Sequence, residues 1–172
     1  KVFYNINSIV NNDTCVIVEG EIDALSLHEA GVPNVVSVPN GATLNHNNLD
    51  YLDNCIDYFE DKTKIILALD TDAPGLALRT EFVRRLGAET CYLVDFKDCK
   101  DANEYLMKYG KEQLKQAINK ARAYPLENVT TFKDIEGDVK DFVTNGFKPG
   151  YQVGLSNFDA IFSTYTGQFI TV

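Results

Sequence analysis

Short apolar runs alternate along this chain with longer segments whose apolar residues recur at helical spacing. Continuous apolar runs, typical of strands that are covered on both faces, predict strands at residues 15–18, 35–38, 64–69 and 90–94. Apolar positions three and four apart predict helices over about residues 22–30, 49–59, 74–86, 102–107 and 111–121. Strands alternating with helices in this way predict an α/β fold, with a mostly parallel sheet flanked by helices.

Glycine and proline mark the ends of these segments. Gly31 and Gly87 follow the last apolar positions of two expected helices, where glycine commonly ends a helix. Pro74 stands where the first turn of a helix tolerates proline. The run Pro39-Asn40-Gly41 is typical of a turn, and it closes the second expected strand.

Acidic residues follow two of the expected strands. Glu19 comes after the first, and Asp70 and Asp72 come after the third. Residues two apart on a strand point the same way, so the two aspartates aim together at whatever lies beyond the sheet. Like charges held that close repel unless a cation or a proton lies between them. Sites in such sheets lie beyond the carboxyl ends of the strands, so the sequence predicts a divalent-metal site there.

Composition limits the class of protein. The 172 residues, 45% of them hydrophobic, suffice for one ordinary core or for a compact domain with a piece of another. The net charge of −9 argues against tight, nonspecific nucleic-acid binding by this segment alone. Four cysteines without a CxxC pair and only two histidines argue against zinc, whereas an all-carboxylate cluster suits Mg²⁺ or Mn²⁺. Reduced cysteines and the lack of a long apolar run lead us to expect a cytoplasmic protein and no membrane.

The helical and strand patterns weaken after about residue 123. Pro125, Gly137, Gly146 and Pro149 interrupt a modest amphipathic stretch, which predicts a linker with a short helix at residues 123–149. A new apolar segment begins at residue 150 and ends on an expected strand at residues 168–172. Because the chain starts with Lys1 rather than Met, we expect it to be part of a longer protein.

Three motifs together resemble the TOPRIM domain, which DnaG-type primases, topoisomerases and some nucleases share. They are Glu19-Gly20-Glu21-Ile22-Asp23, Asp70-Thr71-Asp72-Ala73-Pro74-Gly75 and Lys100-Asp101-Ala102-Asn103-Glu104. Their form is most similar to the primase-helicases of phages and mobile elements, the group that includes Twinkle. The resemblance covers roughly residues 13–122, and we place the TOPRIM domain at residues 1–122. Residues 150–172 resemble the entry to a RecA-like helicase domain, here cut short before its phosphate-binding loop.

The resemblance implies roles for individual residues. Glu19 matches the family's glutamate, a general acid/base or metal ligand, while Asp70 and Asp72 match its metal-binding pair. Asp101 matches the first acid of the third motif and is a further expected ligand. Asn103 stands where DnaG-type primases carry a second acid, which is a departure from the pattern.

Other expected site residues carry weaker signals. Asp23, one helical turn after Glu19, is expected to add charge near the metal. Gly20, Gly41 and Gly75 either serve only as turn residues or let phosphate approach the backbone closely.

The function that the resemblance implies is Mg²⁺-dependent nucleotidyl transfer that makes RNA primers on single-stranded DNA. Single-stranded DNA and nucleoside triphosphates are then the partners, together with an N-terminal template-binding region and a C-terminal helicase that forms a ring. The isolated segment is expected to be inactive, and its source is expected to be a bacterium, a phage or a mobile element. A non-catalytic module that binds metal or partner proteins and a TOPRIM nuclease are the alternatives.

Structural roles would also explain several of these residues. Asp72 and Asp101 each precede an expected helix, where aspartate commonly caps the first turn. Arg79, Arg84 and Arg85 form either a solvated helix face or a contact with nucleic acid.

Overall fold

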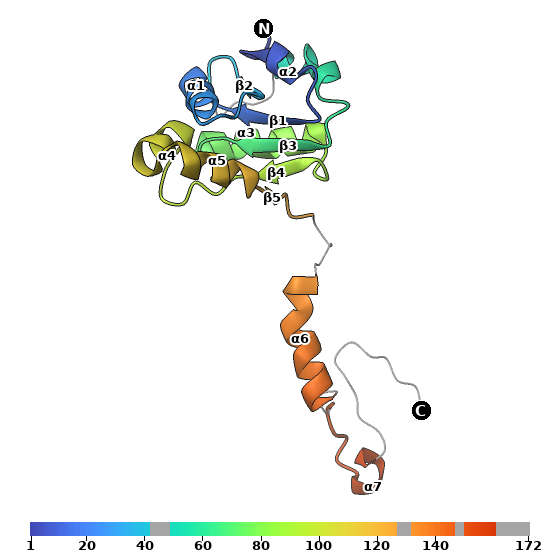
Figure 1. Ribbon diagram of the computed structural model, residues 1–172. Helices are drawn as coiled ribbons and strands as arrows, with labels where there is room; N and C mark the ends of the chain where they lie inside the picture. Colours follow the sequence, from blue (N-terminus) through green and yellow to red (C-terminus); the bar gives the residue numbers. More distant parts are fainter. Residues whose placement is uncertain (42–48, 127–131, 147–149, 161–172) are drawn as a thin grey trace. The chain divides into compact units, whose positions relative to one another are not determined.

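The computed structural model describes residues 1–41, 49–126, 132–146 and 150–160 (Figure 1). The chain divides into two compact units, Lys1–Glu127 and Asn128–Val172. None of the helices in the described ranges is long and apolar enough to cross a membrane.

The described residues of the first unit form a five-stranded sheet in the order β2-β1-β3-β4-β5. The strands are β1 (Thr14–Val18), β2 (Val35–Ser37), β3 (Lys64–Ala68), β4 (Cys91–Leu93) and β5 (Arg122–Ala123). β1 pairs in parallel with β2 and β3, and β3 pairs in parallel with β4. The prediction of a mostly parallel sheet is therefore confirmed. β5 pairs antiparallel with β4 and was not predicted, because two exposed residues carry no strand pattern.

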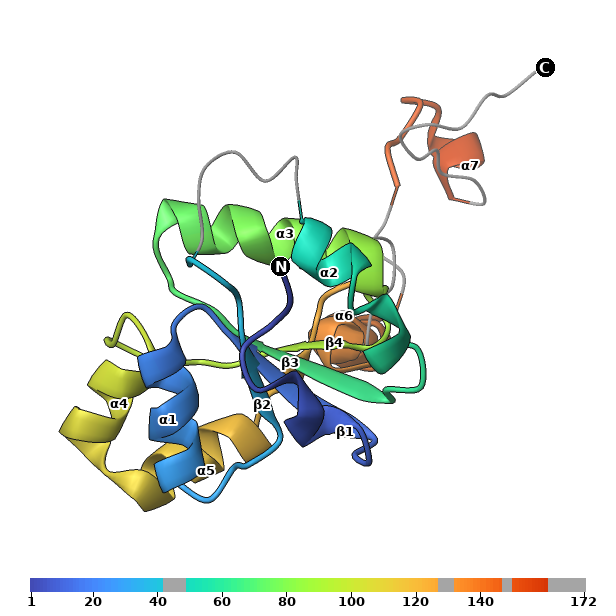
Figure 2. The same cartoon turned by 90° about the horizontal axis from the view of Figure 1, so that it is seen from above.

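Helices cover both faces of this sheet (Figure 2). On one face lie α1 (Glu21–Glu29), α4 (Ala102–Tyr109) and α5 (Lys111–Asn119). On the other face lie α2 (Asp50–Asp53) and α3 (Ala73–Leu86), with 3-10 turns at Ile6–Ile9 and Ile56–Tyr58.

Alternate residues of β1 enter two separate hydrophobic cores. Cys15 and Ile17 lie in the core that contains Phe82 of α3, whereas Val16 and Val18 lie in the core that contains Leu27 of α1. These four residues are at most 1% exposed, so burial on both faces explains why β1 has no polar position after Thr14.

The segment 49–59 differs from its prediction as one helix. α2 ends at Asp53, and Cys55 has left helical geometry with φ −124° and ψ 11° before the 3-10 turn begins. The Asn54 side chain donates a hydrogen bond to the Lys1 carbonyl across 2.9 Å. Aspartate and asparagine are poor helix formers, so this contact and the low local propensity together outweigh the apolar spacing.

The second unit contains α6 (Phe132–Asn145) and α7 (Ser156–Asp159). α6 is longer than the short helix predicted within the linker at residues 123–149. The Asp159 carboxylate accepts hydrogen bonds from the backbone N–H groups of Val153 and Gly154, across 2.7 and 2.9 Å. The strand predicted at residues 168–172 lies outside the described residues. The boundary predicted at residue 122 falls within β5, and the first compact unit extends to Glu127.

Candidate metal centre

The parallel register brings the carboxyl ends of β1 and β3 side by side. Val18, the last residue of β1, pairs with Ala68, the last residue of β3. The chain then continues into Glu19 on one side and Asp70 on the other. The backbone N–H of Asp70 donates to Oε2 of Glu19 across 3.2 Å, which ties the two strand ends together.

Three carboxylates converge at this point. Glu19, Asp70 and Asp72 each offer one carboxylate oxygen, and these oxygens lie within 4.8 Å of one another. Glu19 is buried at 7% exposure, and the aspartates are progressively more exposed. A group of three oxygen ligands at one edge of a sheet is able to hold a hard divalent cation.

Asp72 also caps α3. Its Oδ1 accepts a hydrogen bond from the backbone N–H of Gly75 across 3.0 Å. This hydrogen bond, followed by the neighbouring Lys100, lowers the pKa of Asp72. The cap uses Oδ1 and leaves the second carboxylate oxygen of Asp72 outside the cap, so the capping role is compatible with a place in the carboxylate cluster.

Gly75 lets the first turn of α3 lie against the backbone of Asp70. A Cβ atom at this position would lie 2.3 Å from the Asp70 carbonyl oxygen and 2.9 Å from its carbonyl carbon. No real side chain fits at such distances, so glycine is required for this approach. The role of Gly75 in the structure is to position Asp70.

Lys100 lies against the two aspartates, and the sequence analysis did not assign it a role. Its Nζ is 2.8 Å from Oδ2 of Asp70 and 3.3 Å from Oδ2 of Asp72. The carboxylates, Asp70 foremost, raise the pKa of Lys100. Its position as the first residue of the third motif was the available signal in the sequence.

Two of the expected ligands lie outside the carboxylate cluster. Asp101 caps α4, its Oδ1 accepting from the Glu104 backbone N–H across 2.7 Å. Asp23 is 8% exposed, and its Oδ1 accepts from the Asn103 backbone N–H across 3.0 Å. The Asn103 side chain donates to Oγ of Ser26 across 2.9 Å. In the structure, Asp23, Ser26 and Asn103 join α4 to α1, whereas Asp101 caps α4.

Burial raises the pKa of two carboxyl groups at this edge. The pKa of Glu19 rises to about 7, first through burial and then through the adjacent Asp70 and Asp72 carboxylates. The pKa of Asp23 rises to about 6, mainly through burial, while the hydrogen bond from the Asn103 N–H opposes the shift.

Comparison with known proteins identifies the family. Residues 16–106, more than half of the chain, match a family model described as Toprim-like. The chain belongs to the Toprim-like family. The matched segment begins in β1 and ends in α4, so it contains all three carboxylates of the cluster.

Two curated plant proteins are similar to this Toprim-like chain. The chain is 35% identical to the "Twinkle homolog protein, chloroplastic/mitochondrial" of Arabidopsis thaliana, over 100% of the chain and 27% of that protein. It is 41% identical to the "Primase homolog protein" of the same plant, over 74% of the chain and 43% of that protein. The chain thus spans less than half the length of these relatives.

A solved structure supports the same family. A chain from an assembly of bacteriophage T7 lagging-strand DNA polymerase with primase domains, bound to an RNA/DNA hybrid and dTTP, matches with a TM-score of 0.53. Its sequence identity is 28%, and the match covers 64% of this chain and 56% of that one. The predicted resemblance to Twinkle-like and DnaG-like primases is confirmed at the level of the family.

Gly20 and Gly41, the other two glycines of the predicted site, lie in different surroundings. Gly20 directly precedes α1, and a Cβ there would lie 3.0 Å from Oδ2 of Asp23. Gly41 has φ +68°, and a Cβ there would meet no atom within 4 Å. Close approach of phosphate to these glycines stays a prediction.

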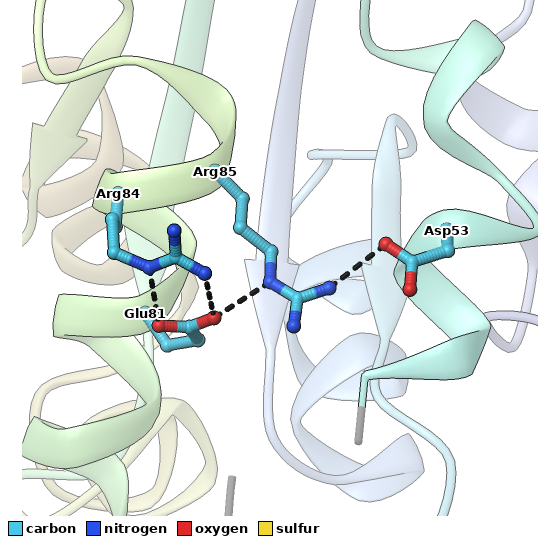
Figure 3. Close-up of polar contacts among 4 residues, drawn as sticks. All are labelled: Asp53, Glu81, Arg84 and Arg85. Carbon is cyan, nitrogen blue, oxygen red and sulfur yellow. Dashed lines mark hydrogen bonds and ion pairs between the residues drawn. The ribbon is translucent and has the colours of Figure 1, made fainter. Parts of the chain in front are cut away.

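Arg84 and Arg85 of α3 form ion pairs with neighbouring carboxylates (Figure 3). Both guanidinium groups contact Glu81 at 2.6 Å, and Arg85 also contacts Asp53 of α2 at 2.8 Å. These contacts join α3 to α2, which favours the structural interpretation of the two arginines over a contact with nucleic acid.

Proposed function

We propose that this Toprim-like domain is the catalytic core of a DNA primase within a primase-helicase, where it adds nucleotides to RNA primers on single-stranded DNA. The observation that carries the proposal is the convergence of Glu19, Asp70 and Asp72 at the ends of β1 and β3. The names of the relatives and the T7 primase assembly point to the same reaction.

The donor set fits Mg²⁺ or Mn²⁺. The three side chains supply only carboxylate oxygens, which hard divalent cations prefer over the nitrogen and sulfur ligands of zinc sites. Glu19, Asp70 and Asp72 are the residues that would hold the ion. When bound, a divalent cation neutralises phosphate charge and lowers the energy of the transition state for nucleotidyl transfer.

The chain's own residues position and tune this site. The hydrogen bond from the Asp70 N–H to Glu19 and the cap of Asp72 on α3 fix the three carboxylates before any substrate arrives. Preorganised groups need little rearrangement in the reaction. In the metal-free protein the pKa of Glu19 is raised to about 7, so a cation that binds this carboxyl near neutral pH would have to displace a proton.

Further domains and partners belong to the proposal as well. The chain spans 27% of the Twinkle homolog and 43% of the primase homolog. We therefore assign template binding and helicase activity to the remainder of a longer protein. Single-stranded DNA and nucleoside triphosphates would be its ligands, and the helicase part would form the ring.

The direct test is primer synthesis by the full-length protein with Asp70→Asn or Asp72→Asn, assayed on single-stranded DNA with Mg²⁺. We expect synthesis to fall by about 100-fold or more, because metal ions supply several kcal/mol of transition-state stabilisation. Asp53→Asn, an exposed aspartate outside the cluster, is the matched control and should prime normally. ATP hydrolysis by the helicase part should persist in all three variants. Normal priming by Asp70→Asn would refute the proposal.

A non-catalytic module is the second candidate, and Lys100 favours it. The ammonium group of Lys100 already balances part of the charge of Asp70 and Asp72, so the pair has a counter-ion without any metal. Calorimetric titration with Mn²⁺ separates the candidates. If the domain binds no Mn²⁺ at millimolar concentration, it is a non-catalytic module and not the catalytic core of a primase.

A further inference from the structure

The backbone of Lys100 is held in place independently of its side chain. Its carbonyl accepts from the Thr71 backbone N–H across 3.2 Å, between the two aspartates of the cluster. Its own N–H donates to Oε2 of Glu104 in α4 across 2.6 Å. The Cα of Lys100 is therefore fixed beside the cluster whatever side chain this residue carries.

The side chain, in contrast, is free to change partners. It is 51% exposed, and its flexible aliphatic stem leads to an ammonium group that water solvates well. Within the described part of the chain, the ion pairs of Asp70 and Asp72 are those with Lys100. The pair with Asp72 is exposed on both sides, and pairs of this kind are weak and readily broken. The pair with Asp70, whose side chain is 14% exposed, is open to water mainly at the lysine.

The oxygen of Asp72 that does not cap α3, and is thus the one open to a divalent cation, is the oxygen that contacts Lys100. Oδ1 of Asp72 accepts the capping hydrogen bond from Gly75, and Oδ2 is the atom that contacts Lys100. Mg²⁺ approaches its oxygen ligands to about 2 Å. An ammonium group on that same oxygen would then lie close to a doubly charged ion and would be repelled.

We propose that Lys100 is an exchangeable counter-cation of this centre: it balances part of the charge of Asp70 and Asp72 in the metal-free protein and leaves them when a divalent cation binds. The inference rests on the proposed function, because it requires the cluster to be a metal site. It assigns Lys100 a role in setting metal affinity rather than in maintaining the fold.

The test is Mn²⁺ titration of the 172-residue chain by calorimetry in metal-free buffer, comparing wild type with Lys100→Met. Removal of two competing, half-exposed ion pairs should tighten Mn²⁺ binding by about 2- to 30-fold. Lys108→Met is the matched control. Lys108 is 49% exposed in an ion pair with Asp98, outside the carboxylate cluster, and its loss should leave Mn²⁺ affinity unchanged.

Thermal unfolding adds a readout that separates this role from a purely structural one. Without metal, Lys100→Met should melt at a lower temperature than wild type, because the carboxylates then repel one another. Saturating Mn²⁺ should remove this difference. A purely structural lysine would lower the melting temperature equally with and without Mn²⁺, and that result would overturn the inference.

The remaining outcomes are also distinct. If Mn²⁺ binds wild type and Lys100→Met with equal affinity, or binds the variant more weakly, the inference is wrong while the proposed function stands. If Mn²⁺ binds none of the three proteins, the metal site and the inference are both wrong.

Discussion

Gly75→Ala should destabilise the Toprim-like domain, although glycine-to-alanine changes inside helices normally stabilise them. In an open helical site the change gains up to about 1 kcal/mol. At residue 75 the new Cβ would lie 2.3 Å from the Asp70 carbonyl oxygen and 3.0 Å from the Asp70 Cβ. Because the first clash is with backbone, a rotamer change cannot relieve it.

The expected loss follows from this overlap. Forcing an extra carbon into a packed site costs about 1–3 kcal/mol, which outweighs the gain in helix propensity. The helix start and Asp70 must move apart, which also weakens the capping hydrogen bond from Gly75 to Asp72. A destabilisation of this size lowers the melting temperature by roughly 5–15 °C in a domain of this length.

Urea unfolding followed by circular dichroism measures the free energy, and Mn²⁺ calorimetry measures the displacement of Asp70. We expect both stability and Mn²⁺ affinity to fall in Gly75→Ala. Gly137→Ala in α6 is the control, because a Cβ there meets no atom within 4 Å, and it should retain or increase helicity. If Gly75→Ala is as stable as wild type, the close approach that we describe does not govern this position.

Three further predictions concern the residues around the cluster. Because the pKa of Glu19 is raised to about 7, the folded state binds more protons than the unfolded state between about pH 4.5 and 7. The free energy of unfolding of the metal-free protein should therefore fall as pH rises through this range. Urea unfolding measures this dependence, and Glu19→Gln should flatten it. Asp101→Ala removes the cap of α4, so it should lose about 0.5–2 kcal/mol of stability with Mn²⁺ affinity unchanged, whereas Asp101→Asn should keep most of the stability. Asn103→Ala removes the hydrogen bond to Ser26 and should lower the free energy of unfolding by about 0.5–1.5 kcal/mol. Asn103→Asp should lower it further, because it adds a carboxylate beside the buried Asp23. Neither variant should tighten Mn²⁺ binding.

Each of these predictions has a clear opposite result. Stability that rises between pH 4.5 and 7 would show that Glu19 is ionised more easily in the folded protein than in the unfolded chain. A tenfold loss of Mn²⁺ affinity in Asp101→Ala would make Asp101 a ligand, as the resemblance first implied. Tighter Mn²⁺ binding by Asn103→Asp would place residue 103 at the metal, contrary to its contact with Ser26.

The order of strands and helices could be predicted because local patterns carry it. β1 and β3 are continuous apolar runs, since both faces of each strand are buried, and glycine follows the ends of α1 and α3. The segment 49–59 and strand β5 could not be predicted. The first is broken by a contact between Asn54 and distant Lys1, and the second is a two-residue pairing with β4.

By itself the sequence determined the parallel α/β sheet and the three acids at its strand ends, because residue spacing and burial on both faces leave local signatures. The tertiary structure decided which acids share one site. Asp23 stands in the same motif as Glu19, and Asp101 stands in the third motif, yet they accept hydrogen bonds from the N–H groups of Asn103 and Glu104 in α4. Lys100 reaches Asp70 and Asp72 because its backbone is bound to Thr71 across the sheet edge. The contacts of Asp23 and Lys100 join residues far apart in the sequence, so they depend on how the elements pack and no local pattern records them. The cap of Asp101 is local, but only the structure shows that Asp101 lies outside the cluster.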